Sequence, residues 1–208
     1  MCSSDLPHNI LEGPFGYSAL IEPLDLTRYT PGAPWRISEI SIKPFPSGRA
    51  SHAVLATLAD IRSSRRPIKS ITAHVPPLIA RLVSRPFSTD MTPAYARLCL
   101  PFLVALMLRD GRIDPRRFTP ETFADPVIGY LAASVQIIID DNPDQNALSP
   151  QRLEIDGETF PIPHTLGSPD APMNAAQALQ KYDLCRTLAG DCDARIFDDP
   201  LSYATDPR

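Results

Sequence analysis

The sequence predicts a mixed α+β domain with two layers, a small sheet packed against helices. Three observations predict this fold class. Segments with strand-like and helix-like periodicity are interspersed along the chain, two short strands read as a hairpin, and 43% of the residues are hydrophobic, which is enough for a core. The chain has 24 prolines and only 9 glycines, which indicates ordered segments separated by proline-containing loops. The hairpin favours this class over a doubly wound parallel fold.

The first expected strand covers residues 35–43. Its apolar residues alternate with polar ones, with one slip of phase, and they are Trp35, Ile37, Ile40 and Ile42. Pro44 ends this strand, and Ser47 is expected to cap the next helix, because a serine hydroxyl can accept a hydrogen bond from a first-turn amide. That helix has an apolar face at spacings of three and four residues, formed by Ala50, Val54, Leu55, Leu58 and Ile61.

A second strand is expected over residues 68–75, where polar and apolar side chains alternate until Pro76–Pro77 stops the pattern. The most apolar segment of the chain then predicts a helix. It should begin at Thr92–Pro93, a good cap and first turn, and run to about Asp110. Pro101 lies inside this helix and predicts a kink, because proline cannot donate to the helical ladder.

Shorter patterns predict the remaining elements. One strand is expected to be buried because four apolar residues surround a single glutamine, and an Asp-Gly pair favours a tight hairpin turn. The expected elements are a turn over residues 115–118, a helix over 126–133, a buried strand over 135–139, hairpin strands over 153–155 and 159–162, and a last helix over 174–188.

Charge and composition exclude several classes of function. The net charge of −4 argues against a broad basic surface for binding nucleic acid, although Arg62, Arg65 and Arg66 form a local basic cluster. The longest apolar run, residues 98–108, is too short to span a membrane. The four cysteines form no CxxC pair, and the N-terminus does not read as a signal peptide. We therefore expect a cytoplasmic protein with reduced thiols and with neither nucleic-acid nor membrane partners.

The segment from Lys43 to His52, KPFPSGRASH, is the strongest candidate for a functional site. It places a lysine just before a helix start, where unpaired amides and the helix dipole attract anions. Lys43 and Arg49 add full charges, and glycine at the Ser47–Gly48 helix start lets a ligand approach the backbone. These features predict a cradle for a carboxylate or phosphate. The alternative is that both cations are solvated and that Ser47 is a plain cap.

His52 lies off the apolar face of its helix, about 130° from the centre of that face. An imidazole in this place is free to act as an acid or base at neutral pH, or it simply faces solvent. The sequence holds no P-loop, GxGxxG, GxSxG or HExxH motif. We therefore expect neither a cofactor nor a metal.

Three ordered motifs resemble the MmgE/PrpD family, whose members include 2-methylcitrate dehydratases, cis-aconitate decarboxylases and an iminodisuccinate epimerase. The resemblance extends from Leu11 to Ala189. The motifs are, in chain order, Lys43–Ser47 with His52, residues 96–102 with Ala105 and Gly111, and residues 167–173 with Lys181–Tyr182.

The resemblance implies a large all-helical domain with a smaller α+β lid inserted into it, an active site between the two, and a homodimer. Because Met1–Leu6 resembles a translated sequencing adapter, we interpret the start of the chain as non-native. On this interpretation the N-terminal helical portion is missing and the fragment alone is inactive. The expected regions are a non-native leader (1–10), a connector from the missing helical domain (11–34), the lid (35–166), and a C-terminal helical segment with a tail (167–208).

Two positions depart from the family pattern. Some members carry a histidine, and others a cysteine, five residues after the motif lysine, where this chain has Gly48. Where the family often has a tyrosine after the motif proline, this chain has Phe102. An acid/base group and a phenol hydroxyl are therefore lost, which argues against decarboxylation in particular.

The resemblance implies the C-terminal portion of a cofactor-independent lyase or isomerase that abstracts a proton next to a carboxylate of a di- or tricarboxylate. Lys43 would bind the substrate carboxylate and take part in catalysis, assisted by Ser47, Gly48 and Arg49, while His52 would serve as an acid/base or orienting group. The alternative is a non-catalytic α+β module for ligand binding or oligomerisation on the same scaffold, which the two departures motivate.

Overall fold

The structure is a computed structural model that describes residues 10–11, 13–14, 16–20, 32, 36–62, 68–193 and 195–205. The chain divides into two units, Met1–Ser38 and Glu39–Arg208. In the first unit the described residues include the short helix α1 (Tyr17–Leu20). Nearly all of the expected leader and connector lie outside the described residues, as do Trp35, Arg65 and Arg66.

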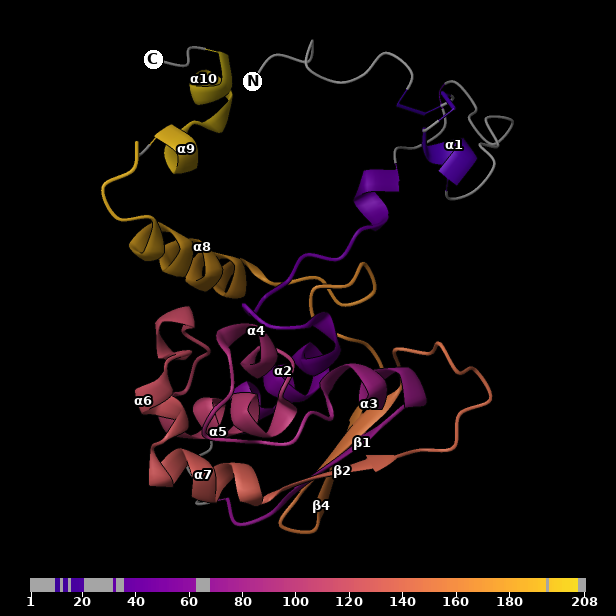
Figure 1. Cartoon of the computed structure of the whole chain (residues 1–208), viewed down its shortest axis with the longest axis vertical. Coiled ribbons are helices and arrows are strands. Elements are labelled where there is room, and N and C mark those ends of the chain that lie inside the picture. The colour runs from indigo at the N-terminus through magenta and orange to yellow at the C-terminus, as the bar shows by residue number, and fades with distance from the viewer. Residues whose placement is uncertain are drawn as a thin grey trace. The chain divides into compact units, whose positions relative to one another are not determined.

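The second unit contains a mixed four-stranded sheet in the order β2-β1-β3-β4 (Figure 1). Its strands are β1 (Ile71–Val75), β2 (Val135–Ile139), β3 (Gln151–Ile155) and β4 (Glu158–Ile162). β1 pairs with β2 in parallel, and the other two pairs are antiparallel. The hairpin β3–β4 turns through Asp156 and Gly157, whose φ angles of 50° and 86° are those of a tight two-residue turn. The expected α+β fold class is confirmed.

The helices of the second unit lie mainly on one face of the sheet. α2, α3, α5 and α7 contact the strands (Figure 1). The strand residues that alternate inward, such as Ile71, Ala73 and Leu153, are fully buried. The helices are α2 (His52–Arg62), α3 (Pro77–Val83), α4 (Pro93–Ala96), α5 (Leu100–Asp110), α6 (Pro120–Phe123), α7 (Pro126–Ala133), α8 (Ala175–Ala189), α9 (Arg195–Asp198) and α10 (Pro200–Thr205), with 3₁₀ turns η4 (Arg49–Ser51) and η5 (Pro115–Arg117). A further 3₁₀ turn, η3 (Arg36–Glu39), lies across the division between the two units.

The opposite face of the sheet carries polar residues. His74 on β1 lies there between Arg152 and Glu154 of β3, with its Nε2 at 3.2 Å from a Glu154 oxygen and its Nδ1 at 2.8 Å from the Arg152 guanidinium. Arg152 also donates to Asp140, at 3.2 Å. One apolar face and one polar face make this a two-layer domain, as the sequence predicts.

Several element predictions are confirmed. The helix over 126–133 and the strand over 135–139 have the expected bounds, and α8 begins after Asn174, which accepts a hydrogen bond from the amide of Gln177 as a cap. The predicted apolar face of α2 is buried except for the partly exposed Ile61. Gly111 ends α5 with a φ of 75°, the left-handed conformation that glycine adopts without strain.

The strand predicted over residues 35–43 is wrong within the described part of that range. Residues 36–39 form η3 instead, and Ile37, Ile40 and Ile42 are all more than half exposed. No strand of the described sheet lies beside this segment to bury its apolar side, and β-propensity depends on that context. The amide of Ile42 donates instead to the carbonyl of Gly167, at 2.8 Å.

The predicted cap and kink are also wrong. Gly48, not Ser47, stands at the N-cap of η4, because the Ser47 hydroxyl bonds to the hydroxyl of Ser51 at 2.8 Å. The apolar segment forms two helices, α4 and α5, and Pro101 lies in the first turn of α5, where a missing amide costs nothing. The sequence reasoning also missed α3, which begins at the second of the two strand-ending prolines, Pro77.

β2 was expected to be buried and is an edge strand. Its C-terminal residues Ile138 and Ile139 are 42% and 61% exposed. A short apolar run cannot distinguish a central strand from an edge strand, because both read as continuous hydrophobic residues. Within the described residues, none of the helices is both long and apolar enough to cross a lipid bilayer.

Candidate functional site

The segment from Lys43 to His52 lies where the three sequence motifs meet. On one side the amide of Gly48 donates to the carbonyl of Arg97 at 3.0 Å, in the break between α4 and α5. On the other side the amide of Ile42 donates to the carbonyl of Gly167 at 2.8 Å. Residues far away in sequence, Arg97 and Gly167, therefore hold this segment in place, which local sequence alone could not reveal.

Gly48 allows close packing inside the protein. A Cβ atom at this position would lie 2.5 Å from Cδ2 of Leu98, so any larger residue requires that leucine to move. The Gly48 amide is also engaged by the Arg97 carbonyl. The cradle expected at this helix start therefore has one amide fewer for an anion.

Gly167 fixes the other side of the segment. Its φ of 87° lies in the left-handed region, and a Cβ atom there would overlap the carbonyl oxygen of Ile42 and lie 3.0 Å from Cδ of Pro44. The loop around it is closed by the amide of Gly167, which donates to Ala171 at 2.8 Å. Only glycine allows the two chain segments to come this close.

His52 is fully buried at the start of α2, so the prediction that it lies free at the helix surface is wrong. The segment before the helix folds over it, and the ring of Phe45 packs edge-on against the imidazole with 5.6 Å between centroids. Neither ring nitrogen has a hydrogen-bond partner of good geometry among the described residues. The main-chain groups of Ser47 and Phe45 raise the pKa of the imidazole, which offsets only part of the lowering caused by burial.

The environment of His52 disfavours the imidazolium. The pKa of His52 is lowered from 6.5 to about 4, mainly by burial and in smaller part by the nearby charges of Lys43 and Arg49. His52 is therefore neutral at pH 7. In that state it can accept a proton or a hydrogen bond, but it holds no proton to give as an imidazolium acid.

The two cations of the segment differ in exposure. Lys43 is exposed, and its ammonium donates to the carbonyl of Ser47 at 3.4 Å. Arg49 is half-buried, and its Nε atom is buried without a hydrogen-bond partner among the described residues. A buried guanidinium N–H without an acceptor is costly, and an anion would satisfy it. The paired hydroxyls of Ser47 and Ser51 hold the turn that contains Arg49.

A cleft of about 710 Å³ adjoins the segment, a volume within the range of small-molecule sites. Phe45 lines it, together with residues of α2, the end of α5 and one side of α8. Phe45 therefore contacts both the cleft and the imidazole, whereas His52 itself does not line the cleft. The polar residues of α8 in the lining are Gln177, Gln180, Lys181, Asp183 and Thr187.

Sequence reasoning missed the positions of Phe45, Arg112 and Arg116 in this lining. Both arginines are paired with Asp114, at 3.2 and 2.6 Å. Nothing in the local sequence marked them, because only the fold brings the end of α5 beside α8. Lys181 belonged to the third motif but had no assigned role.

Phe102 lies in the core and is fully buried. Its ring packs against Phe123, Phe118 and Phe87, with centroid distances of 5.2, 5.6 and 6.4 Å. A tyrosine hydroxyl at this position would have to find a partner inside an aromatic cluster.

The low pKa of His52 predicts an acid-sensitive fold. The unfolded chain binds a proton at this residue below pH 6.5, whereas the folded chain does so only below about 4. Stability should therefore fall as pH falls through this window, by about 3 kcal/mol in total. Urea unfolding between pH 7 and pH 4 measures this slope, and His52→Leu should flatten it. An equally steep slope in His52→Leu would show that another group is responsible.

The comparisons with known proteins identify the family. No curated protein gives a significant sequence match to this chain. The sequence profile of the MmgE/PrpD C-terminal domain matches residues 45–197, which include His52 and the second and third motifs. The match begins two residues after Lys43 and covers most of the chain. This chain therefore belongs to the MmgE/PrpD family and carries its C-terminal domain.

Proposed function

We propose that this chain is the carboxylate-binding C-terminal portion of a cofactor-independent lyase or isomerase that acts on a di- or tricarboxylate. The observation that carries this proposal is the set of unsatisfied polar groups around His52. Within the part of the chain that the structure describes, Arg49 Nε and both imidazole nitrogens are buried and form no hydrogen bond, and a second cation, Lys43, lies near His52. A carboxylate bound between Lys43 and Arg49 would supply the missing acceptor.

The chemistry of this substrate class needs such cations. Abstraction of a proton next to a carboxylate builds negative charge onto that carboxylate, and cations in a water-poor site stabilise it more strongly than cations on a surface. Lys43 and Arg49 would bind and polarise the carboxylate. His52, neutral at pH 7, would orient it as a hydrogen-bond partner or accept a proton once Phe45 has moved aside.

The catalytic proposal and a binding-only module are separated by two measurements on the same chain. Calorimetry with citrate should give saturable heat whether the chain is catalytic or only binds its ligand. Incubation of citrate in D₂O, followed by proton NMR, should show exchange at the carbon next to a carboxylate only if the chain contributes a working base. Absence of saturable heat would contradict both functions.

The binding-only module is favoured by the surroundings of the two positions that depart from the family pattern. Gly48 is packed against Leu98, and Phe102 is enclosed by aromatic rings. A side chain at position 48 would require Leu98 to move, and a hydroxyl on the ring at position 102 would lie in an aromatic cluster. Binding without exchange in D₂O would establish this second function for the chain alone.

A further inference from the structure

The cleft beside α2 follows one face of this helix, and that face leads to His52. Ala56, Ala59 and Asp60 line the cleft, and they stand four, seven and eight positions after His52, the spacing of neighbours on one side of a helix. Two of the three are alanines, whose small side chains leave the space beside the helix open. His52 itself is fully buried and does not line the cleft. Along α2, the cleft therefore ends one helical turn from the imidazole.

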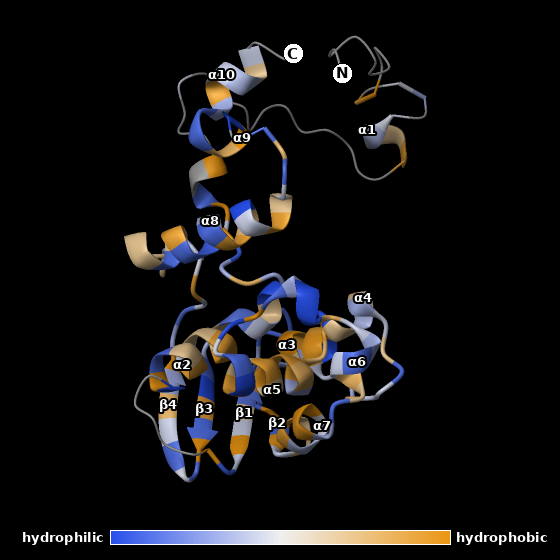
Figure 2. Ribbon diagram, turned by 90° about the vertical axis from the view of Figure 1, so that its left-hand side faces the viewer, coloured by the Kyte–Doolittle hydropathy of each residue, from blue (hydrophilic) through white to orange (hydrophobic). Residues whose placement is uncertain are grey.

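The ring of Phe45 lies at this end of the cleft. It belongs to the cleft lining, and it also packs edge-on against the imidazole of His52, with 5.6 Å between centroids. Across the cleft stands one side of α8, a helix in which Figure 2 shows hydrophilic residues interspersed with hydrophobic ones. A cleft of this size and mixed polarity suits a small polar ligand, and Phe45 is the ring that such a ligand would meet next to His52.

The main chain around Phe45 is held on both sides. The amides of Ile42 and Gly48 donate to carbonyls of other segments, at 2.8 and 3.0 Å. Pro44 and Pro46 flank Phe45, and each proline fixes its own φ and restricts the residue before it. The side chain of Phe45, in contrast, can turn between rotamers. Access to His52 therefore needs a movement of the ring and not of the main chain.

We propose that the cleft is the entrance to the carboxylate site and that Phe45 is the gate at its inner end. The phenyl ring turns into the cleft while the segment that carries it stays in place, and a small carboxylate passes from the cleft to Arg49 and His52. The identity of this ligand rests on the proposed function. The opening itself is a property of Phe45 and His52, so it can be tested without a carboxylate.

Carbethoxylation of the 208-residue chain by diethyl pyrocarbonate at pH 7 tests the gate. The reagent modifies neutral imidazoles that it can reach, and peptide mass mapping gives the rate at His52 relative to that at the exposed His164. Phe45→Ala should raise this ratio at least about 10-fold, because it removes the ring packing that keeps the gate closed. Ala56→Phe, which fills the cleft in front of the gate, should lower it. A ratio that neither variant changes would overturn the proposal.

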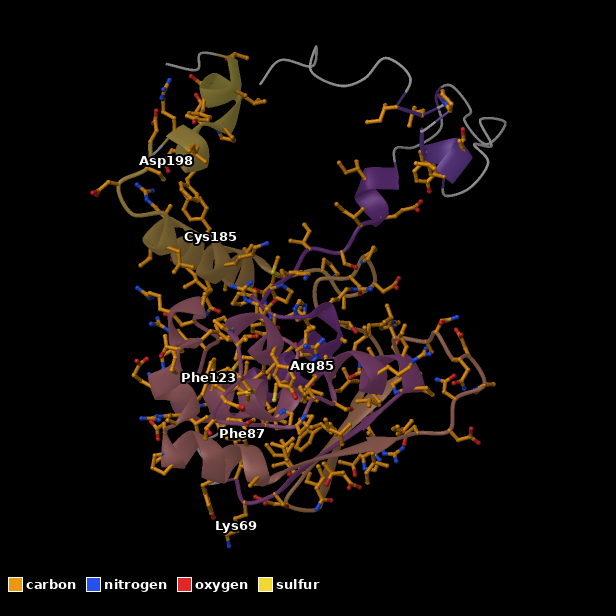
Figure 3. The ribbon with its side chains drawn as sticks, viewed as in Figure 1. Lys69, Arg85, Phe87, Phe123, Cys185 and Asp198 are labelled. Carbon is orange, nitrogen blue, oxygen red and sulfur yellow. The ribbon has the colours of Figure 1, made fainter. Side chains whose placement is uncertain are left out.

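Phe87→Ala is the matched control. Phe87 is partly buried like Phe45, but it stacks on Phe102 at 6.4 Å, and Figure 3 shows it well away from α8. This variant also loses a phenyl ring from the domain, yet it should modify His52 at the wild-type ratio. An equal rise in Phe45→Ala and Phe87→Ala would overturn the proposal, since general loosening of the fold would then expose His52.

Amide hydrogen exchange separates movement of the ring from movement of the main chain. In the wild type, the hydrogen-bonded amides of Ile42 and Gly48 should stay protected over the time in which His52 is modified. Exchange of these amides as fast as His52 reacts would also overturn the gate, because the whole segment would then be opening.

Citrate tests the ligand separately from the gate. Saturating citrate should shield His52, but not His164, from the reagent in the wild type and in Phe45→Ala. If the variants alter the ratio as expected and citrate shields neither histidine, the gate stands and the carboxylate function is refuted. If citrate shields His52 while Phe45→Ala and Ala56→Phe react like the wild type, the carboxylate function stands and the gate is refuted.

Discussion

Replacing Arg49 by alanine should weaken citrate binding about 10- to 100-fold, the loss expected when a charge-assisted hydrogen bond in a buried place is removed. The reason is that the buried Nε donor of Arg49 has no acceptor among the residues whose structure is described, and a carboxylate supplies one. Lys43→Ala should weaken binding by less, because Lys43 is exposed and its charge is screened. Isothermal titration calorimetry measures both losses.

The matched control is Arg81→Ala on α3, which also removes one positive charge. Arg81 is exposed and donates to the carbonyl of Gln145, on a different part of the domain. Citrate affinity should be unchanged in this variant. Since Arg49 lowers the pKa of His52, Arg49→Ala should also raise that pKa, which an NMR titration detects independently of ligand. Equal losses of affinity in Arg49→Ala and Arg81→Ala would mean that citrate responds only to net charge.

Gly167→Ala should be the most destabilising single change in the candidate site, at about 3 kcal/mol. Two costs add: an alanine with a φ of 87° is strained, and its Cβ would overlap the carbonyl of Ile42. That carbonyl belongs to rigid main chain and cannot rotate away as a side chain can. The segment from Ile42 to Phe45 must move, so citrate affinity should fall together with the melting temperature.

Gly157→Ala separates these two costs. Gly157 has nearly the same φ, 86°, but a Cβ there would meet nothing within 4 Å. This variant should lose only the conformational cost, about 1 kcal/mol, and should bind citrate normally. If both variants lost the same stability and both kept their affinity, the contact between Gly167 and Ile42 would have no role in shaping the site.

Local patterns predicted most elements because their signals are complete within the element. The bounds of α7 and β2 follow from proline and hydrophobic runs, and the β3–β4 turn follows from its Asp-Gly pair. The element predictions were wrong where the conformation of a segment depends on residues that are distant in sequence. Residues 36–43 alternate like a strand, but no strand lies beside them within the described part of the sheet.

The candidate site shows the same division between local and distant information. Helix periodicity placed His52 off the apolar face of α2, and that is correct for the helix alone. Its burial results from the preceding segment, which folds back over it because Gly167 and Arg97 hold that segment on both sides. The cation pair Lys43 and Arg49 could be read from the sequence. The sequence could not show that Arg49 Nε has no acceptor among the described residues.

The most direct test of a carboxylate site at Lys43, Arg49 and His52 is an NMR titration of the His52 ring, with and without citrate. The free chain should show a pKa of about 4. A bound carboxylate should shift the ring resonances saturably and raise this pKa, because a nearby negative charge favours the imidazolium. Saturable binding that leaves the His52 resonances and its pKa unchanged would contradict the account, since the anion would then bind elsewhere.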